Sequence, residues 1–145
     1  MNREIQKIKW RRIWHIAEAV LLVLLIAGIA FTCFRISTEG HRAFREAKNV
    51  KLAFQMLEIE YYADQKSVYD PGRLNGMSEG VQERISQLLE NDGYVMITAY
   101  RKKERKVTGF IYTIGHYRVT YRYNEEKEDE YTIDLVIPIL HYDGH

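Results

Sequence analysis

The residues of this chain that could do chemistry are few and widely separated. Glu60 and Asp64 stand one helical turn apart, and His141, Asp143 and His145 end the sequence. Two such carboxylates could serve acid–base catalysis and the terminal trio could bind a metal, but a solvated helix face and a polar chain end explain both patterns more simply. We find no phosphate-binding glycine loop, zinc-binding histidine pair or nucleophile elbow. The sequence therefore predicts a protein that is not an enzyme, with no cofactor, no metal and no identified small-molecule substrate.

Glu18 is the one acidic residue within the longest apolar stretch of the chain. An ionised carboxylate costs ~2.5–3.5 kcal/mol at the centre of a bilayer and less near its edge. Glu18 lies only one helical turn after Trp14, near the edge of the stretch, so it could snorkel to the headgroups or pair with Arg11 or His15. Alternatively, a partner in another chain satisfies its charge upon assembly. The sequence leaves both interpretations open.

Two charged runs of opposite sign occur in the last third of the chain. Residues 101–106 (RKKERK) are mostly basic, and residues 125–130 (EEKEDE) are mostly acidic. In an antiparallel meander the first and third turns emerge at the same end of the sheet, so the two runs should lie side by side. They are either solvated turns, worth ~0–1 kcal/mol per exposed ion pair, or complementary patches that set the register of neighbouring subunits. The candidate interaction residues are Arg101, Lys102, Lys103, Arg105, Glu125, Glu126, Glu128 and Asp129.

An apolar stretch near the N-terminus is the strongest structural signal. Residues 19–34 carry no charge, and extending the stretch back to Ile13 gives 22 residues, or roughly 33 Å of helix, which is enough to span a bilayer. Trp10 and Trp14 lie at its N-terminal edge, where interfacial tryptophans are common. We therefore predict a transmembrane helix over residues 13–35. The alternative is a signal peptide that is cleaved near Ala30.

Charge is distributed unevenly along the 145 residues. The net charge of +1 combines a strongly basic leader, residues 1–12, with a nearly neutral remainder. By the positive-inside rule the leader predicts a cytoplasmic N-terminus and an extracytoplasmic C-terminal domain at the cell membrane, although further basic residues after residue 40 weaken the contrast. A nearly neutral domain argues against nucleic-acid binding. The single cysteine, Cys33, excludes an intrachain disulfide.

After the membrane segment, the pattern changes to that of an exported domain over residues 36–145. Apolar residues recur at steps of three and four from Ala43 to Tyr61, which predicts an amphipathic helix over 38–66. The stretch from Ile13 to Asp70 contains no proline, so this helix can continue the membrane helix, with residues 37–40 as the weak point between them.

The remainder of the chain predicts a sheet. A short helix over residues 80–91 precedes four segments rich in β-branched and aromatic residues. The predicted strands cover residues 94–100, 107–114, 117–123 and 131–139. Their short polar links favour a four-stranded antiparallel meander, one face of which the amphipathic helix covers. The predicted fold class is therefore α+β.

The order of these parts resembles that of type IV pilins and pseudopilins. In both, a basic leader precedes a mostly apolar helix with one glutamate near its start, an amphipathic extension and an antiparallel sheet. Residues 14–22 (WHIAEAVLL) lie where pilins carry G-F-T-L-I-E and further apolar residues, and residues 46–71 resemble the pilin helix that ends in a loop. The chain departs from the pattern at Ile13, which replaces the glycine after which pilins are cut, and at Trp14 and His15, which replace phenylalanine and threonine.

The resemblance implies a non-enzymatic structural subunit of a bacterial type IV pilus or type II secretion system. Such a subunit assembles with like or related subunits through its N-terminal helix. The residues to which the resemblance assigns roles in assembly are Trp14, Glu18, Leu21 and Leu25. Glu18 would neutralise the N-terminal amine of a neighbour if the chain is cut before Trp14, and would need another partner if Ile13 prevents the cut.

Two other functions fit the same sequence. The first is a single-pass, membrane-tethered accessory or binding domain that acts beside a larger membrane complex. The second is a small-molecule binder that uses an aromatic face of the sheet. That face would consist of Tyr112, Tyr117, Tyr121 and Tyr123, although sheet core and cross-strand pairing explain these tyrosines more simply.

Overall fold

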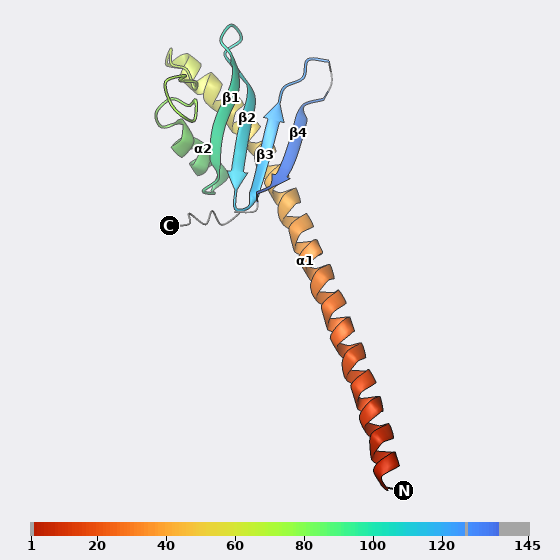
Figure 1. The fold of residues 1–145 in the computed structure, drawn as a ribbon. Helices are drawn as coiled ribbons and strands as arrows, with labels where there is room; N and C mark the ends of the chain where they lie inside the picture. The colour runs from red at the N-terminus through yellow and green to blue at the C-terminus, as the bar shows by residue number, and fades with distance from the viewer. Residues whose placement is uncertain (1, 127, 137–145) are drawn as a thin grey trace, which may run out of the picture. The chain divides into compact units, whose positions relative to one another are not determined.

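The computed structural model describes residues 2–126 and 128–136, with side chains from Trp10 onward. It confirms the predicted α+β class, because a long apolar N-terminal helix precedes a four-stranded antiparallel sheet (Figure 1). The chain divides into two compact units, residues 1–39 and residues 40–145. Helix α1 (Asn2–Ala63) contributes its first part to one unit and its last part to the other.

The first unit consists of the N-terminal part of α1. Its large apolar side chains from Trp10 to Phe34 are all exposed, by 53% to 69%, so the helix is apolar on every side rather than along one stripe. Within the described residues, α1 is the one helix long and apolar enough to cross a membrane. The hydroxyl of Thr32 donates to the carbonyl of Gly28 over 2.9 Å, which satisfies this polar group inside the helix as a lipid environment requires.

Helix α1 continues through residues 37–40, the weak point of the sequence. The Thr38 hydroxyl donates to the carbonyl of Phe34 over 2.9 Å. One turn apart, Arg35 and Glu39 form an ion pair with a distance of 3.0 Å between Nη2 and Oε1, a spacing that favours helix. The stretch therefore carries contacts that support the helix rather than ending it.

The second unit contains the predicted meander. Its strands are β1 (Tyr94–Arg101), β2 (Lys106–Ile114), β3 (Tyr117–Arg122) and β4 (Glu130–Leu135). They lie in the order β1-β2-β3-β4, and every neighbouring pair is antiparallel. The observed bounds differ from the predicted ones by one residue at several ends. The last part of the fourth predicted strand, residues 137–139, lies outside the described residues.

The core lies between one face of this sheet and the last part of α1. The predicted apolar stripe is buried at Ala43, Ala47, Val50, Phe54 and Leu57. Across the interface, the rings of Phe54 and Phe110 lie 5.6 Å apart, centroid to centroid. Each large side chain buried in this way stabilises the unit by about 1.5–3 kcal/mol relative to exposure. Hydrophobic burial therefore fixes which face of α1 meets the sheet.

Helix α2 (Val81–Leu89) lies beside β1 (Figure 1) and is shorter than predicted. Gly80 and Glu90 flank it with φ angles of 81° and 52°, a left-handed conformation that ends a helix at both sides. Gln82 joins α2 to the sheet, because its Oε1 atom accepts a hydrogen bond from the N–H of Val95 over 3.1 Å. The prediction of helix over residues 80–91 therefore overran by one residue at the start and two at the end.

The alternation of side chains between the two faces of β1 holds only for its first half. Val95 and Ile97 face the core, but the pairing register shifts on both sides of Ala99. Ala99 is consequently exposed and Tyr100 packs against the core, the reverse of what strict alternation would give. Gly109 on β2 makes room for this bulge, since a Cβ atom there would lie 2.8 Å from Oγ1 of Thr98.

Candidate functional site

The residues predicted to act in assembly lie on one face of α1 in the first unit. Trp14, Glu18, Leu21 and Leu25 follow each other at steps of four, three and four, which places them along one stripe of a helix with 3.6 residues per turn. All four are exposed. The helix therefore offers a continuous surface with one carboxylate to another helix, because shape and interhelical hydrogen bonds drive such contacts in lipid.

Glu18 has one neighbouring partner among the described residues. Its Oε2 atom lies 3.8 Å from Nδ1 of His15, and both side chains are 77% exposed. This is the local pairing that the sequence left open, although 3.8 Å exceeds a hydrogen-bond distance. Glu18 therefore retains its capacity to accept hydrogen bonds from another chain.

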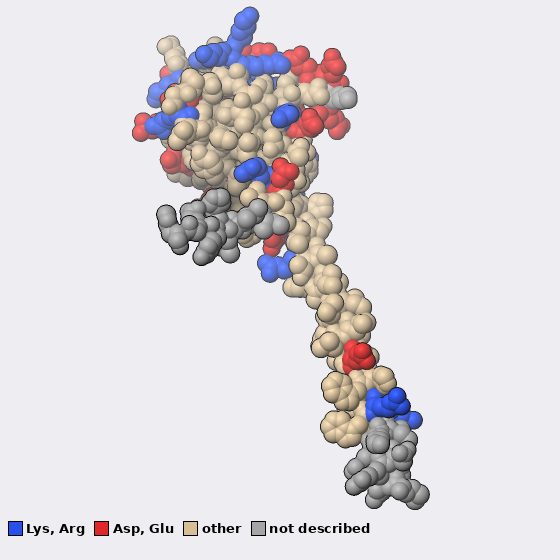
Figure 2. All heavy atoms as spheres, in the orientation of Figure 1, with Lys and Arg blue, Asp and Glu red and all other residues tan. Residues whose placement is uncertain are grey.

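The two charged turns lie side by side in the second unit, as predicted. An ion pair joins Arg101 at the end of β1 to Glu125 in the loop between β3 and β4. Figure 2 shows blue and red side chains gathered next to each other over this end of the sheet. Arg101 also contacts Glu104 within its own turn, with 3.2 Å between Nη1 and Oε1. The meander thus brings opposite charges together from residues 24 positions apart.

The basic turn contains both bound and free cations. Arg105 donates a hydrogen bond to the carbonyl of Lys66 over 3.4 Å, and its guanidinium lies 5.0 Å from the ring centroid of Tyr62. Lys102 and Lys103 are exposed, and neither contacts an acidic residue in the described part of the chain. Arg105 therefore packs on its own chain, whereas the two lysines extend freely, and an interaction role for Arg105 stays a prediction.

The acidic loop is likewise divided between internal and free groups. Asp129 forms an ion pair with Lys51 of α1 and accepts a hydrogen bond from the hydroxyl of Tyr121 over 3.1 Å. Asp129 therefore holds the loop against the helix, and its role as an interaction residue stays a prediction. Glu126 and Glu128 are exposed and have no ion-pair partner among the described residues.

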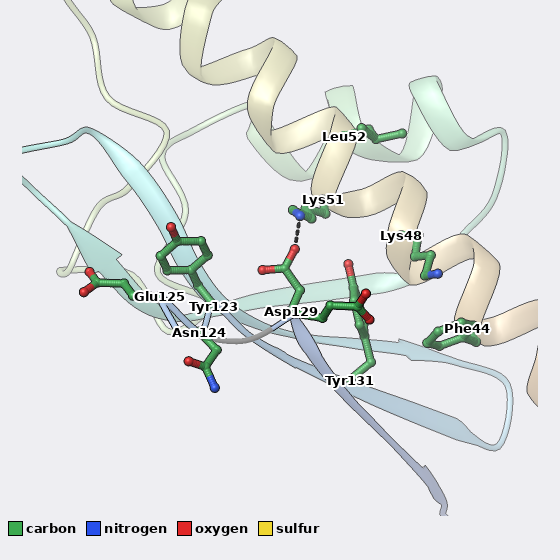
Figure 3. Close-up of a pocket in the computed structure, with 10 residues that line it drawn as sticks. Phe44, Lys48, Lys51, Leu52, Tyr123, Asn124, Glu125, Asp129 and Tyr131 are labelled. Atoms are coloured by element: carbon green, nitrogen blue, oxygen red, sulfur yellow. Dashed lines mark hydrogen bonds and ion pairs between the residues drawn. The ribbon is translucent and has the colours of Figure 1, made fainter.

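A groove of about 770 Å³ lies between α1 and this loop. Figure 3 shows Lys51 and Phe44 on the helix side, with Tyr123, the residue after β3, and Tyr131 of β4 on the other side; Leu52 also lines the groove. The rings of Phe44 and Tyr131 meet edge to face, with centroids 5.3 Å apart. Glu125 and Glu128 complete the rim on the loop side. The groove therefore combines an aromatic wall with an acidic edge.

Two partly buried carboxylates make contacts that the sequence does not predict. Glu58 lies outside the apolar stripe of α1, yet its Oε1 atom accepts a hydrogen bond from the backbone N–H of Val107 over 2.5 Å. Burial raises the pKa of Glu58 above its ordinary value, although the Val107 hydrogen bond partly opposes this shift. No sequence signal identifies this contact, because its two residues are 49 positions apart and meet only through the packing of α1 on β2.

Glu46 forms the second contact. Its Oε1 atom pairs with Nε of Arg42 at 2.8 Å, and its Oε2 atom accepts a hydrogen bond from the hydroxyl of Tyr112 over 2.8 Å. Burial, followed by this hydrogen bond, raises the pKa of Tyr112. The spacing of Arg42 and Glu46, one helical turn, is the only part of this contact that the sequence indicates.

The remaining candidate residues lie in the core, on the surface or outside the described residues. Tyr112, Tyr117 and Tyr121 are buried in the core, which contradicts a binding surface formed by their exposed rings. Glu60 pairs with Arg84 on the surface at 3.4 Å. No group of three histidine, cysteine or acidic side chains suited to a metal occurs in residues 10–126 and 128–136. The predicted His141, Asp143 and His145 lie outside the described residues.

Comparison of the chain with models of protein families, with curated proteins and with solved structures gave no match. The site must therefore be interpreted from its own geometry. That geometry offers two contact surfaces, the stripe on α1 in the first unit and the charged turns with their groove in the second.

Proposed function

We propose that this protein is a non-enzymatic, pilin-like structural subunit, anchored in the cell membrane and assembled with like or related subunits through its N-terminal helix. The observation that carries the proposal is the character of α1. One helix of 62 residues is apolar on every side in its first part and buries a single stripe against an antiparallel sheet in its last part. A helix built in this way serves as both membrane anchor and core element of the folded unit.

The stripe on α1 supports assembly by helix contacts. In a bilayer, moving an apolar side chain from lipid into a helix–helix contact yields no hydrophobic free energy. Helices there associate through close packing and polar contacts instead. Glu18 is the acidic side chain within the apolar stretch, and a carboxylate there is costly unless it is paired. A neighbouring helix that provides a donor would lower this cost. We therefore assign Glu18 to the contact between subunits, with Trp14, Leu21 and Leu25 as its packing surface.

Orientation and processing form part of the proposal. The basic leader supports an orientation with the N-terminus in the cytoplasm and the folded unit outside. Because Ile13 replaces the glycine expected at the cut, we propose a divergent subunit. The alternative, a membrane-tethered accessory domain beside a larger complex, gains support from this same departure, since an uncut chain has no free amine at Trp14 for a neighbour to bind.

Co-purification tests the assembly role of Glu18. Two copies of the full chain with different affinity tags are produced in the same membrane, extracted in mild detergent and purified through one tag. Glu18→Ala should strongly reduce recovery of the second tag, whereas Glu39→Ala, which removes the exposed carboxylate that pairs with Arg35, should leave it unchanged. Equal recovery of wild type and Glu18→Ala would remove the assigned role.

Two further measurements separate the proposed function from its alternatives. Mass spectrometry of the purified chain determines the mature N-terminus: a start at Trp14 supports the pilin-like subunit, a start near Phe31 indicates secretion, and an intact chain favours the tethered domain. Orientation follows from Lys103→Cys in a Cys33→Ser background. A membrane-impermeant maleimide should label the introduced thiol in intact cells, and protection of that thiol would contradict an extracytoplasmic folded unit.

A further inference from the structure

A groove of about 770 Å³ between α1 and the β3–β4 loop has no occupant assigned by the proposed function. Several of its charged groups are already satisfied within the chain. Lys51 pairs with Asp129, and Nζ of Lys48 lies 4.5 Å from the ring centroid of Phe44. Arg101 pairs with Glu125 at the rim. Lys48 remains charged on the helix side, so the negative charge without an ion-pair partner among the described residues lies on the loop side.

Two glutamates of the loop have no ion-pair partner among the described residues. Glu128 lines the groove, and Glu126 precedes it in the same exposed loop. Behind them stand the rings of Tyr123 and Tyr131, whose faces attract cations. Nζ of Lys106 already lies 3.8 Å from the ring centroid of Tyr123. The chemistry of the groove therefore suits a lysine side chain, with an aliphatic stem against the aromatic wall and an ammonium group at the acidic rim.

The same chain presents a segment of this chemistry. Lys102 and Lys103 occupy the turn between β1 and β2, are exposed, and pair with no acidic group of the described residues. The adjacent Arg101–Glu125 ion pair shows that a cation of this turn and a carboxylate of the acidic loop are compatible partners. Because the turn and the loop lie at the same end of the sheet, each copy carries a donor surface and an acceptor surface next to each other.

We propose that the groove, with its rim residues Glu126 and Glu128, receives the turn at Lys102 and Lys103 of a second copy of this chain. The inference rests on the proposed function, since copies anchored through the same helix stand parallel in one membrane. Parallel copies placed side by side bring the basic turn of one against the acidic loop of the next, a head-to-tail contact that can repeat along a row. Exposed ion pairs contribute little affinity, so this contact sets the register of copies that their helices hold together.

Cysteine cross-linking tests the contact in the full chain. In a Cys33→Ser background, copies with Lys103→Cys and copies with Glu128→Cys carry different tags and are produced in the same membrane. Each copy has one cysteine, so a disulfide between the tags can form only between chains. The mixed pair should cross-link at least about fivefold more than a matched pair of His116→Cys with Glu128→Cys, because His116 lies in the turn at the other end of the sheet.

Charge reversal provides the second arm. Lys102→Glu in the first copy, or Glu126→Lys in the second copy, should each lower the cross-link about fivefold. Combining the two reversals should restore it, since the opposite signs face each other again. Cross-linking that is insensitive to either reversal, or a combination that fails to restore it, would overturn the charge-mediated contact.

Co-purification of the two tags distinguishes the failure of this inference from the failure of the proposed function. If the tags co-purify but Lys103→Cys shows no preference for Glu128→Cys, the copies assemble through their helices and the groove has no such occupant. If the tags do not co-purify and no preference appears, both the inference and the proposed assembly are wrong. A third outcome is that high salt removes the preferential cross-link of Lys103→Cys with Glu128→Cys while the two tags still co-purify. That result supports the assigned roles of both the helix stripe and the charged contact.

Discussion

The hydroxyl of Tyr112 donates a hydrogen bond to the carboxylate of Glu46 over 2.8 Å, joining the second strand to α1 across 66 residues of sequence. Asn91, which follows α2, also reaches this carboxylate, with 3.4 Å between Nδ2 and Oε2. One half-buried glutamate therefore ties together both helices and the sheet. A carboxylate accepts several hydrogen bonds at once, and hydrogen bonds to charged groups are stronger than those between neutral groups.

Removing this hydroxyl should weaken the second unit. We expect Tyr112→Phe to lower the free energy of unfolding by about 1–2 kcal/mol, because Glu46 loses one buried donor but keeps Arg42. Urea unfolding of the full chain in detergent measures the change. Both tryptophans lie in the first unit, so near-UV circular dichroism of the tyrosines is the suitable signal. Tyr94→Phe is the control, since that side chain is exposed; equal stability of Tyr112→Phe and wild type would contradict the role.

Truncating the buried stripe of α1 should have a larger effect. Leu57 is fully buried, whereas Ile59, two residues later, is 72% exposed. Leu57→Ala should lower the free energy of unfolding by about 2–5 kcal/mol because it leaves a cavity, and Ile59→Ala should change it by less than about 0.5 kcal/mol. The same urea unfolding compares the two. Similar losses from both variants would mean that the assigned face of the helix is wrong.

Two glycines should respond to alanine in opposite directions. A Cβ atom at Gly93 would lie 2.3 Å from Cε2 of the buried Tyr112 ring, so Gly93→Ala should destabilise the unit by at least about 1–3 kcal/mol. At Gly40, within α1, the nearest atom would be 3.5 Å away on Tyr117, an ordinary contact. Gly40→Ala should therefore raise the free energy of unfolding by about 0.5–1 kcal/mol through helix propensity. Destabilisation by Gly40→Ala would show that the helix needs flexibility there.

The partly buried carboxylate of Glu58 should make stability depend on pH. Burial raises its pKa in the folded state above the ordinary value, so the folded chain binds more protons than the unfolded chain between these two pKa values. The contribution of Glu58 to stability therefore falls as the pH rises through this window. Glu58→Gln, which can still accept the Val107 hydrogen bond, should be more stable than wild type at neutral pH and equal to it in acid.

Urea unfolding of both chains from about pH 3 to about pH 7 measures this difference. Glu60→Gln is the matched control, because Glu60 lies on the same helix but is exposed and pairs only with Arg84 on the surface. That variant should gain no stability at neutral pH. If Glu58→Gln also leaves the free energy of unfolding at neutral pH unchanged, burial does not destabilise the ionised Glu58 carboxylate.

Much of the fold could be predicted because local patterns determine it. The helical period from Ala43 to Leu57 identified the buried face correctly, and the short links among four β-rich segments identified the meander. The bulge at Ala99 escaped prediction, although Gly109 within a strand was a usable signal. The helix ends at Gly80 and Glu90 were missed by one or two residues, since turn conformation depends on contacts beyond the local sequence.

The candidate functional site also combines features that the sequence predicts with features that it does not. The sequence located the apolar helix, its carboxylate at Glu18 and the two oppositely charged turns, because hydropathy and charge are properties of the residues themselves. Only the tertiary structure separated the free charges at Lys102 and Glu128 from Asp129, whose carboxylate is bound to Lys51. It also revealed the groove and the partly buried Glu58. These features depend on which side chains meet across the interface between helix and sheet, and that pairing arises from packing between segments far apart in the chain.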